Sequence, residues 1–394
     1  MRGFLSRHGA LPEQIRGREA LRELISDMEE GLCGRGNIPM LLSYLPPRTD
    51  PPAGGSCAVL DAGGTTLRIG RASFGEDGAV ELADIRRMPM PGSRQRIGCD
   101  AFFSSLAEAL GRPERVGFCF SYNVEMDRDL DGRLLAWCKE IDIPDAVGKK
   151  VGGSLAAAMD RPCRVHVLND SVAAMLGAAE PVRVGIILGT GVNVCYPEDC
   201  GRIPKLERPL KGSMIVSTEV GEFARIPRSS FDEAVIAATE DPALAQAEKQ
   251  CSGGYLGDTV CACWHQAAEE GLLPGCFLEG RWSLAQISGY LAGEDTPIPE
   301  NETAKALAAV LICRAAKIAA VLCAGPVLRC SEPGETVPVA VEGSQYWRLT
   351  GFRQAFHEAI RELLPDRELR VVRTEDACLR GAALAAFAEP MELL

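Results

Sequence analysis

The sequence is poor in the features that mark several protein classes. It has four histidines, 6% aromatic residues and a formal net charge of −12, from 42 Lys plus Arg against 54 Asp plus Glu. Because a nucleic-acid backbone would be repelled by this charge, the chain lacks the electrostatic footprint of a nucleic-acid-binding protein. Its 16 cysteines form no Cys-x-x-Cys pair and no His-bearing zinc spacing. This excludes the common zinc modules and predicts reduced core thiols.

Long apolar segments are also missing. The first 35 residues mix Arg, Glu and Asp at short intervals, which excludes the apolar core of a signal peptide. The longest apolar stretch, 304–328, is interrupted by Lys305, Arg314 and Lys317, whereas a membrane span needs about 18 uninterrupted apolar residues. We therefore expect a cytoplasmic protein with neither nucleic-acid nor membrane partners.

What the chain does contain is a repeated pattern of strands and helices. Its 394 residues are enough for two domains. A Gly-Thr turn stands between two apolar strands in each half, GGTT at 63–66 and GTG at 189–191. This repetition predicts a duplicated α/β domain with a cleft between two lobes. The Pro-rich segment 45–55 predicts a hinge or crossing between the lobes.

The first turn carries an acidic residue. Asp61 stands in LDAGGTT, where a predicted strand ends and two glycines leave the backbone amides open to an anion. The motif is neither GxGxxG nor a P-loop, which disfavours those two nucleotide folds. A tight hairpin turn capped by Asp61 fits the same residues.

A second acidic residue follows a later strand. Asp170 in VLNDSV lies between a predicted strand and a helix, where a carboxylate can accept the proton of a substrate hydroxyl while Asn169 holds a neighbouring one. Asn and Asp are also the favoured N-caps of such a helix. Both interpretations stay open at this point.

The order of the motifs resembles that of a known family. GNIPMLLSYLPP, LDAGGTTLRIG, FCFSYNVE with DGRLLAWCKEIDI, LNDSVA, ILGTGVNVCY, STEVGEF, SGGYLGD, VAVEGS and LRGAALAA follow one another as in hexokinases of the hexokinase/glucokinase type. These belong to the superfamily of actin, sugar kinases and chaperone ATPases. The resemblance runs from about Asp27 to Ala386, without the zinc-binding cysteines of bacterial repressor-type kinases.

The resemblance implies a two-lobed, actin-like (ribonuclease H-like) α/β fold. The small lobe would comprise 56–168 with a C-terminal helix at 380–394, and the large lobe 1–55 and 169–379. The implied activity is ATP- and Mg²⁺-dependent phosphorylation of a hexose, glucose or a relative, at its 6-hydroxyl. The implied assembly is a monomer or homodimer with small-molecule partners.

The resemblance also implies a role for individual residues. Asp170 would be the general base, and Lys139 would contact the sugar and the reacting oxygen. The other implied sugar-binding residues are Ser121, Cys138, Asn169, Asn193, Glu219 and Asp258. The implied phosphate and nucleotide contacts are Asp61, Gly63, Gly64, Thr65, Thr66, Arg68, Gly189, Thr190, Gly191, Gly343 and Ser344. Asp61 would also hold Mg²⁺ through water.

Departures from the family pattern lie near the sugar, at Cys138, Asn123, Ser217 and Asp258. We therefore expect retained phosphoryl transfer with an altered affinity or choice of hexose. Two alternatives share much of the pattern: a sugar-sensing relative without turnover, and an actin-like chaperone ATPase.

Overall fold

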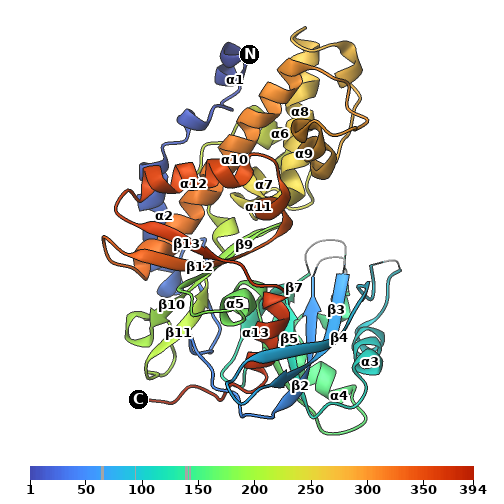
Figure 1. The fold of residues 1–394 in the computed structure, drawn as a ribbon, viewed down its shortest axis with the longest axis vertical. Coiled ribbons are helices and arrows are strands. Elements are labelled where there is room, and N and C mark those ends of the chain that lie inside the picture. The colour runs from blue at the N-terminus through green and yellow to red at the C-terminus, as the bar shows by residue number, and fades with distance from the viewer. Residues whose placement is uncertain (64–65, 94, 138–140, 142) are drawn as a thin grey trace.

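Two β-sheets organise the chain in the computed structural model, which describes residues 1–63, 66–93, 95–137, 141 and 143–394. Figure 1 shows the six-stranded sheet and most helices in the upper part of the molecule and the five-stranded sheet in the lower part. Helices α5 (Asp170–Leu176) and α13 (Ala377–Ala385) lie between them. The predicted two-lobed mixed α/β architecture is confirmed.

The five-stranded sheet has the order β4-β3-β2-β5-β8. Its strands are β2 (Ser56–Ala62), β3 (Thr66–Phe74), β4 (Val80–Pro89), β5 (Arg115–Phe120) and β8 (Arg164–Leu168). Strands β2, β3 and β4 form an antiparallel meander, and β5 and β8 run parallel to β2. The same part of the chain contains α3 (Cys99–Leu110), β6 (Asn123–Met126), β7 (Gly132–Ala136), η2 (Pro144–Ala146) and α4 (Val151–Ala157).

The six-stranded sheet has the order β1-β11-β10-β9-β12-β13. Its strands are β1 (Leu41–Leu42), β9 (Val184–Leu188), β10 (Val192–Asp199), β11 (Ser213–Ser217), β12 (Thr336–Glu342) and β13 (Glu368–Val372). Strands β9, β10 and β11 form an antiparallel meander, and β12 and β13 run parallel to β9. Each sheet thus repeats a meander followed by two parallel strands, which confirms the duplication predicted from the two turns.

The remaining helices belong to the part of the molecule that holds the six-stranded sheet, and some of them pack on other helices rather than on the sheet. They are α1 (Arg2–Arg7), η1 (Pro12–Gln14), α2 (Gly17–Leu32), η3 (Cys200–Arg202), η4 (Val220–Glu222), α6 (Ser230–Ala237), α7 (Glu248–Cys251), α8 (Gly253–Glu269), η5 (Gly275–Phe277), α9 (Leu284–Ala292), α10 (Glu302–Arg329), α11 (Ser344–Arg348) and α12 (Phe352–Leu363). Helix α10 is long and apolar enough to cross a membrane, but 72% of its most apolar window is buried inside the fold. It is the central helix of the large hydrophobic core.

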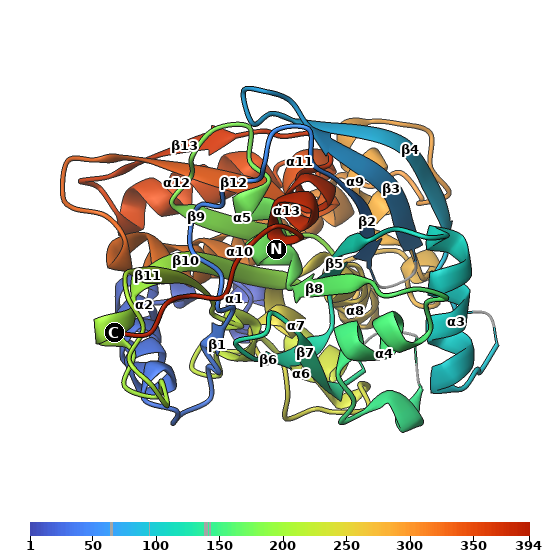
Figure 2. The same cartoon turned by 90° about the horizontal axis from the view of Figure 1, so that it is seen from below.

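Helices α5 and α13 pack unusually closely because glycines face backbone. A Cβ at Gly381 of α13 would lie 1.9 Å from the Ala173 carbonyl oxygen of α5, and one at Gly177 would lie 1.9 Å from the Ala377 carbonyl oxygen. Figure 2 shows α13 beside β2 and β5, and a Cβ at Gly117 of β5 would meet the Ala382 carbonyl at 1.8 Å. Since side chains would force these elements apart, the glycines fix α5 against α13 and the small sheet.

The C-terminal helix differs from the prediction. Helix α13 begins at Ala377 and ends at Ala385, rather than spanning 380–394. Pro390 disfavours the α conformation at Glu389, so a helix continuing to 394 is not expected. The final segment returns to the six-stranded side, where the Leu394 amide donates to the Pro209 carbonyl at 3.1 Å.

The Pro-rich segment 45–55 is the predicted crossing. The Leu45 carbonyl accepts from Ile215 of β11 at 2.9 Å, and the Gly54 amide donates to Phe74 of β3 at 2.9 Å. The segment therefore leaves one sheet and enters the other. The fifteen cysteines of the described part are free thiols, most of them buried, as predicted.

Candidate active site

Asn169 and Asp170 lie at the start of helix α5, directly after β8. Asn169 is the N-cap, and its Oδ1 accepts from the Ser171 amide at 2.8 Å and from Ser171 Oγ at 2.7 Å. Asp170 is the first residue of the helix and is half-buried. The N-cap interpretation is therefore right for Asn169. It also orients the side chain, because the occupied oxygen leaves the amide nitrogen as the donor.

Three residues, one each from β10, β11 and the loop before η4, join Asn169 in one hydrogen-bonded cluster. Asn193 Nδ2 donates to Ser217 Oγ at 3.0 Å and to Glu219 Oε1 at 2.6 Å. Ser217 Oγ donates to Glu219 Oε1 at 2.8 Å and to Asn169 Oδ1 at 3.4 Å. We call Asn169, Asn193, Ser217 and Glu219 the polar cluster. Its amides and carboxylate match the paired donors and acceptors of a polyol.

Glu219 is the most perturbed member of the polar cluster. Its backbone is left-handed, with φ 57° and ψ 44°, a conformation that non-glycine residues adopt at a cost and that is typical of functional sites. Burial raises the pKa of Glu219 to about 7, and the charges of Asp170 and Glu248 add to the rise, although hydrogen bonds from Ser217 and Asn193 oppose it.

Glu248 is a site residue that the sequence interpretation missed. Its Oε2 accepts from the Val192 amide at 2.9 Å, directly after the second glycine turn. Asp258, predicted as the last sugar contact, is instead exposed on α8, one helical turn beyond Gly254. The sequence signal that could have identified Glu248 is its place at the start of a short helix directly before Ser-Gly-Gly at 252–254.

The first glycine turn is surrounded by charge. Arg68 Nε donates to Asp61 Oδ2 at 2.8 Å, and Arg68 Nη1 donates to Asp376 Oδ1 at 2.8 Å. Burial works to lower the pKa of Arg68, but the Asp61 carboxylate raises it above its ordinary value. Burial also raises the pKa of nearby Glu342, which the positive charge of Arg68 opposes. Arg68, predicted as a phosphate contact, is thus held between two carboxylates in this structure.

The turn itself is a hairpin that also contacts Ser121 and Tyr122. The Gly63 amide donates to the Thr66 carbonyl at 3.1 Å, and Tyr122 Oη donates to the Gly63 carbonyl at 3.0 Å. The Ser121 amide donates to the Ala62 carbonyl at 3.2 Å. The hairpin interpretation is right, but Asp61 pairs with Arg68 through its side chain. The predicted residues Gly64, Thr65, Cys138 and Lys139 lie outside the described residues.

The second glycine turn is held mainly by backbone contacts. The Gly189 amide donates to the Gly191 carbonyl at 3.0 Å. A Cβ at Gly343, the residue between β12 and α11, would lie 2.1 Å from the Leu188 carbonyl, and Gly343 has φ +119°. Only glycine fits there. Gly343 and Ser344 therefore lie beside Gly189, and their contacts with the donor stay predictions.

The described residues fit a magnesium ion that is held mostly by water and by substrate phosphates. They contain no group of three or more His, Cys, Asp or Glu side chains able to hold a metal. Asp61 is 8% exposed and already shares one oxygen with Arg68. Mg²⁺ commonly keeps several waters and takes one or two carboxylates plus substrate phosphates, which suits Asp61 as a water-mediated partner.

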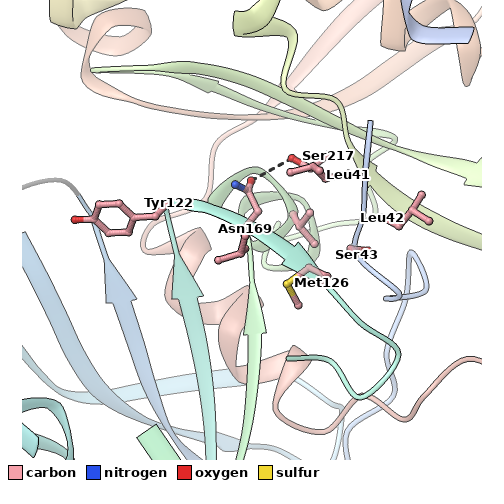
Figure 3. Close-up of a pocket in the computed structure, with 9 residues that line it drawn as sticks. Leu41, Leu42, Ser43, Tyr122, Met126, Asn169 and Ser217 are labelled. Carbon is pink, nitrogen blue, oxygen red and sulfur yellow. Dashed lines mark hydrogen bonds between the residues drawn. The ribbon is translucent and has the colours of Figure 1, made fainter. Parts of the chain in front are cut away.

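A small pocket lies behind the polar cluster. It is lined by Leu41, Leu42, Ser43, Tyr122, Val124, Met126, Asn169, Val172 and Ser217. Figure 3 shows Asn169 hydrogen-bonded to Ser217, with the β1 residues Leu41 and Leu42 and with Met126 of β6 around them. The pocket leaves room for about one water molecule. It is too small for a hexose, and its mostly apolar wall offers few partners to hydroxyl groups.

Comparison with known proteins assigns this arrangement to a family. Two family models described as hexokinase match residues 12–179 and residues 183–289 and 286–388. The chain belongs to the hexokinase family. Hexokinase-7 of Oryza sativa subsp. japonica is 28% identical over 432 residues, which cover 94% of this chain and 93% of the relative.

Solved structures agree on the fold. A hexokinase from Schistosoma mansoni complexed with glucose has a TM-score of 0.82 at 22% identity, covering 98% of this chain and 99% of that one. A ROK family glucokinase from Streptomyces griseus with glucose and AMPPNP has a TM-score of 0.53 at 20% identity, covering 84% and 99%. The hexokinase fold thus extends over nearly the whole chain, and the ROK fold shares its frame.

Proposed function

We propose that this protein transfers the γ-phosphoryl group of ATP to the 6-hydroxyl of a hexose, glucose or a close relative. The observation that carries the proposal is the polar cluster beside Asp170, at the base of two glycine turns. A sugar presents neighbouring hydroxyl groups, and amides and carboxylates match these. The glucose and AMPPNP bound in the Streptomyces glucokinase support a hexose and a nucleoside triphosphate as substrates.

Asp170 is the general base of the proposed reaction. It receives the proton of the 6-hydroxyl as that oxygen attacks the γ-phosphorus in line. Its position at the start of α5 is fixed by the close contact of α5 with α13. Asn169 donates its amide hydrogen to an adjacent hydroxyl, and Glu219 and Asn193 take others. The enzyme contributes mainly alignment and electrostatics.

The glycine turns bind the donor. We expect the turns at Gly63 and at Gly189–Gly191 to face the phosphates, because glycine lets the backbone approach an anion closely. Mg²⁺, when bound near Asp61, neutralises phosphate charge. Arg68 balances the carboxylates of Asp61 and Asp376, so that the phosphates do not meet uncompensated negative charge.

The proposal also covers closure of the lobes, the oligomeric state and the cellular compartment. We expect the lobes to close on the sugar and exclude water from the phosphorus, in a cytoplasmic monomer or homodimer. Small-angle scattering with and without hexose measures closure as a fall in the radius of gyration, and an unchanged radius would contradict it. Sedimentation and cell fractionation measure the assembly and the compartment.

The test of the proposed function is ADP release from Mg-ATP across a panel of hexoses, with wild type and Asp170→Asn in parallel. The substitution keeps the size of the side chain and removes the base. We expect at least one hexose to stimulate turnover, and the variant to lose at least about 100-fold in kcat.

Two results would overturn the proposal. A hexose that raises the melting temperature without turnover would make the protein a sugar sensor. ATP hydrolysis that no hexose changes would favour a protein-directed ATPase. An Asp170→Asn variant with wild-type kcat would remove Asp170 from the role of base.

A further inference from the structure

The chain between α7 and α8 lies directly against the second glycine turn. We call residues 248–254 the elbow. The Gly253 amide donates to the Gly189 carbonyl at 2.8 Å, and the Gly254 amide donates to the Thr190 carbonyl at 3.0 Å. The two hydrogen bonds join the first two residues of a 17-residue helix to two successive residues of the turn.

The two glycines are required for close approach rather than for backbone conformation. A Cβ at Gly253 would lie 2.7 Å from the Gly189 carbonyl oxygen, and one at Gly254 would lie 2.8 Å from the Thr190 carbonyl oxygen. Neither glycine has a positive φ. A side chain at either position would therefore push against backbone atoms of the turn, which have no rotamer to change.

These hydrogen bonds also change what the start of α8 can do. The first amides of a helix lack partners within the helix and are a common place for phosphate to bind. Here the amides of Gly253 and Gly254 are occupied by carbonyls of the turn. The helix consequently holds the turn in place, and the turn meets the anion.

The other end of the elbow holds the exit of the same turn. Glu248 Oε2 accepts from the Val192 amide at 2.9 Å, and a Cβ at Gly191 would lie 2.7 Å from that oxygen. The charge of Glu248 also acts on Glu219 of the polar cluster. One seven-residue segment thus contacts the turn at both ends and approaches the sugar side.

We propose that Gly253 and Gly254 are positioning residues for the phosphoryl donor, which fix the Gly189–Gly191 turn through backbone hydrogen bonds without contacting the phosphate. The proposal rests on the proposed kinase function, because it assigns the turn to the donor. It goes beyond that function in placing donor affinity under the control of two glycines at a helix terminus that hold the turn.

The test is Gly254→Ala, with Gly275→Ala as the matched control. Gly254 is exposed, so the variant has space everywhere except toward the turn. A Cβ at Gly275, in the same lobe, meets only Leu278 Cδ1 at 3.8 Å. We expect Gly254→Ala to raise the KM for Mg-ATP at least about 10-fold and to lower kcat, because small displacements of bound groups cost this much.

The affinity for hexose distinguishes a loss of turn positioning from general damage to the fold. The Kd for hexose without nucleotide should stay within about 2-fold of wild type, as should every constant of Gly275→Ala. An unchanged KM for Mg-ATP in folded Gly254→Ala would overturn the proposal. Equal losses of hexose and ATP affinity would also overturn it, because they would indicate a merely structural effect.

A second measurement uses the unaltered protein and does not depend on folding of a variant. Hydrogen exchange of a peptide covering 248–260 is followed with and without Mg-AMPPNP. Binding should slow exchange at the Gly253 and Gly254 amides, since a filled turn opens less often. No slowing at saturating nucleotide would overturn the proposal. Failure of the kinase function is distinguishable, because AMPPNP affinity is measured without turnover.

Discussion

The two glycine turns occupy equivalent places in the duplicated fold but are held in opposite ways. The first, after β2, is bordered by the side chains of Asp61, Arg68 and Asp376, which form ion pairs. The second, after β9, is bordered by Gly253, Gly254 and Gly343, whose backbone atoms contact it. The duplication therefore fixes where the turns lie, and their neighbours determine whether charge or shape controls each one.

This difference predicts different sensitivities. Interactions between partly exposed charges weaken as salt screens them, whereas backbone contacts at van der Waals distance do not depend on ionic strength. Damage to the first turn should accordingly vary with salt. Damage to the second turn, including that of Gly254→Ala, should be the same at low and high salt.

The largest effect is expected for Arg68→Met, which removes charge beside the first turn. Asp61, Asp376 and Glu342 lose their shared cation, so phosphates would meet uncompensated carboxylates. We expect kcat/KM for Mg-ATP to fall about 100-fold, as for loss of an oriented charge at a transferring phosphate. We also expect a loss of about 1–3 kcal/mol in unfolding free energy, less than for a fully buried pair, because the Arg68 side chain is 23% exposed.

Arg71→Met is the matched control on the same strand. The Arg71 side chain is 80% exposed and lies 3.8 Å from Asp84, a pair expected to contribute about 0–1 kcal/mol. Steady-state kinetics at low and high salt and urea unfolding measure both variants. If Arg71→Met lost as much as Arg68→Met, or if the loss were independent of salt, the electrostatic account of the first turn would be wrong.

A smaller effect is expected where the second turn meets the sugar side. Glu248→Gln keeps an acceptor for the Val192 amide, next to Asn193 of the polar cluster, but makes that acceptor uncharged. We expect the KM for hexose to rise about 10-fold, because a hydrogen bond to a charged acceptor contributes about 1.5–3 kcal/mol. Asp258→Asn, which alters an exposed carboxylate ten residues later, should leave it within about 2-fold.

Kinetics across hexose concentrations, with ATP saturating, compares the two variants. A larger change in Asp258→Asn than in Glu248→Gln would restore the assignment made from the sequence. The comparison also tests whether the elbow serves the sugar as well as the turn.

Much of this arrangement was predictable from the sequence. The glycine turns, the meanders and Asn169–Asp170 are local features, because strand periodicity and turn residues lie within a few positions of each other. The structure brings Asn169, Asn193 and Glu219 together as the family resemblance implied. Ser217, noted only as a departure, proves to be a hydrogen-bonding member of the same cluster.

The rest depended on contacts that local patterns do not encode. The ion pair of Arg68 with Asp376 was not predicted, because the two residues lie 308 positions apart in the sequence. Asp258 was predicted from the family motif alone, and the contact of Glu248 with the second turn is visible only once the structure fixes the direction of α8. The contact of Gly253 and Gly254 with the carbonyls of the turn was not predicted, because the turn and the start of α8 lie far apart in the sequence.

The smallest expected effect is a pH dependence from Glu219. Its pKa is about 7 in the fold, above the ordinary 4.5, so folding holds a proton that the unfolded chain releases. The stability from this proton is complete below about pH 4.5 and is lost as the pH rises through 7. The melting temperature of wild type relative to Glu219→Gln should therefore fall across this interval, while Glu233→Gln on the exposed face of α6 should follow wild type. Ionised Glu219 accepts hydrogen bonds from sugar hydroxyls, so kcat/KM for hexose should rise about fourfold between about pH 6.5 and pH 8, roughly as the ionised fraction does. Because Asp170 and Glu248 act on Glu219, the midpoint belongs to the coupled group. If the pH profile of Glu219→Gln still rose like that of wild type, the midpoint would belong to another residue. The polar cluster would then have no effect on the reaction at Asp170.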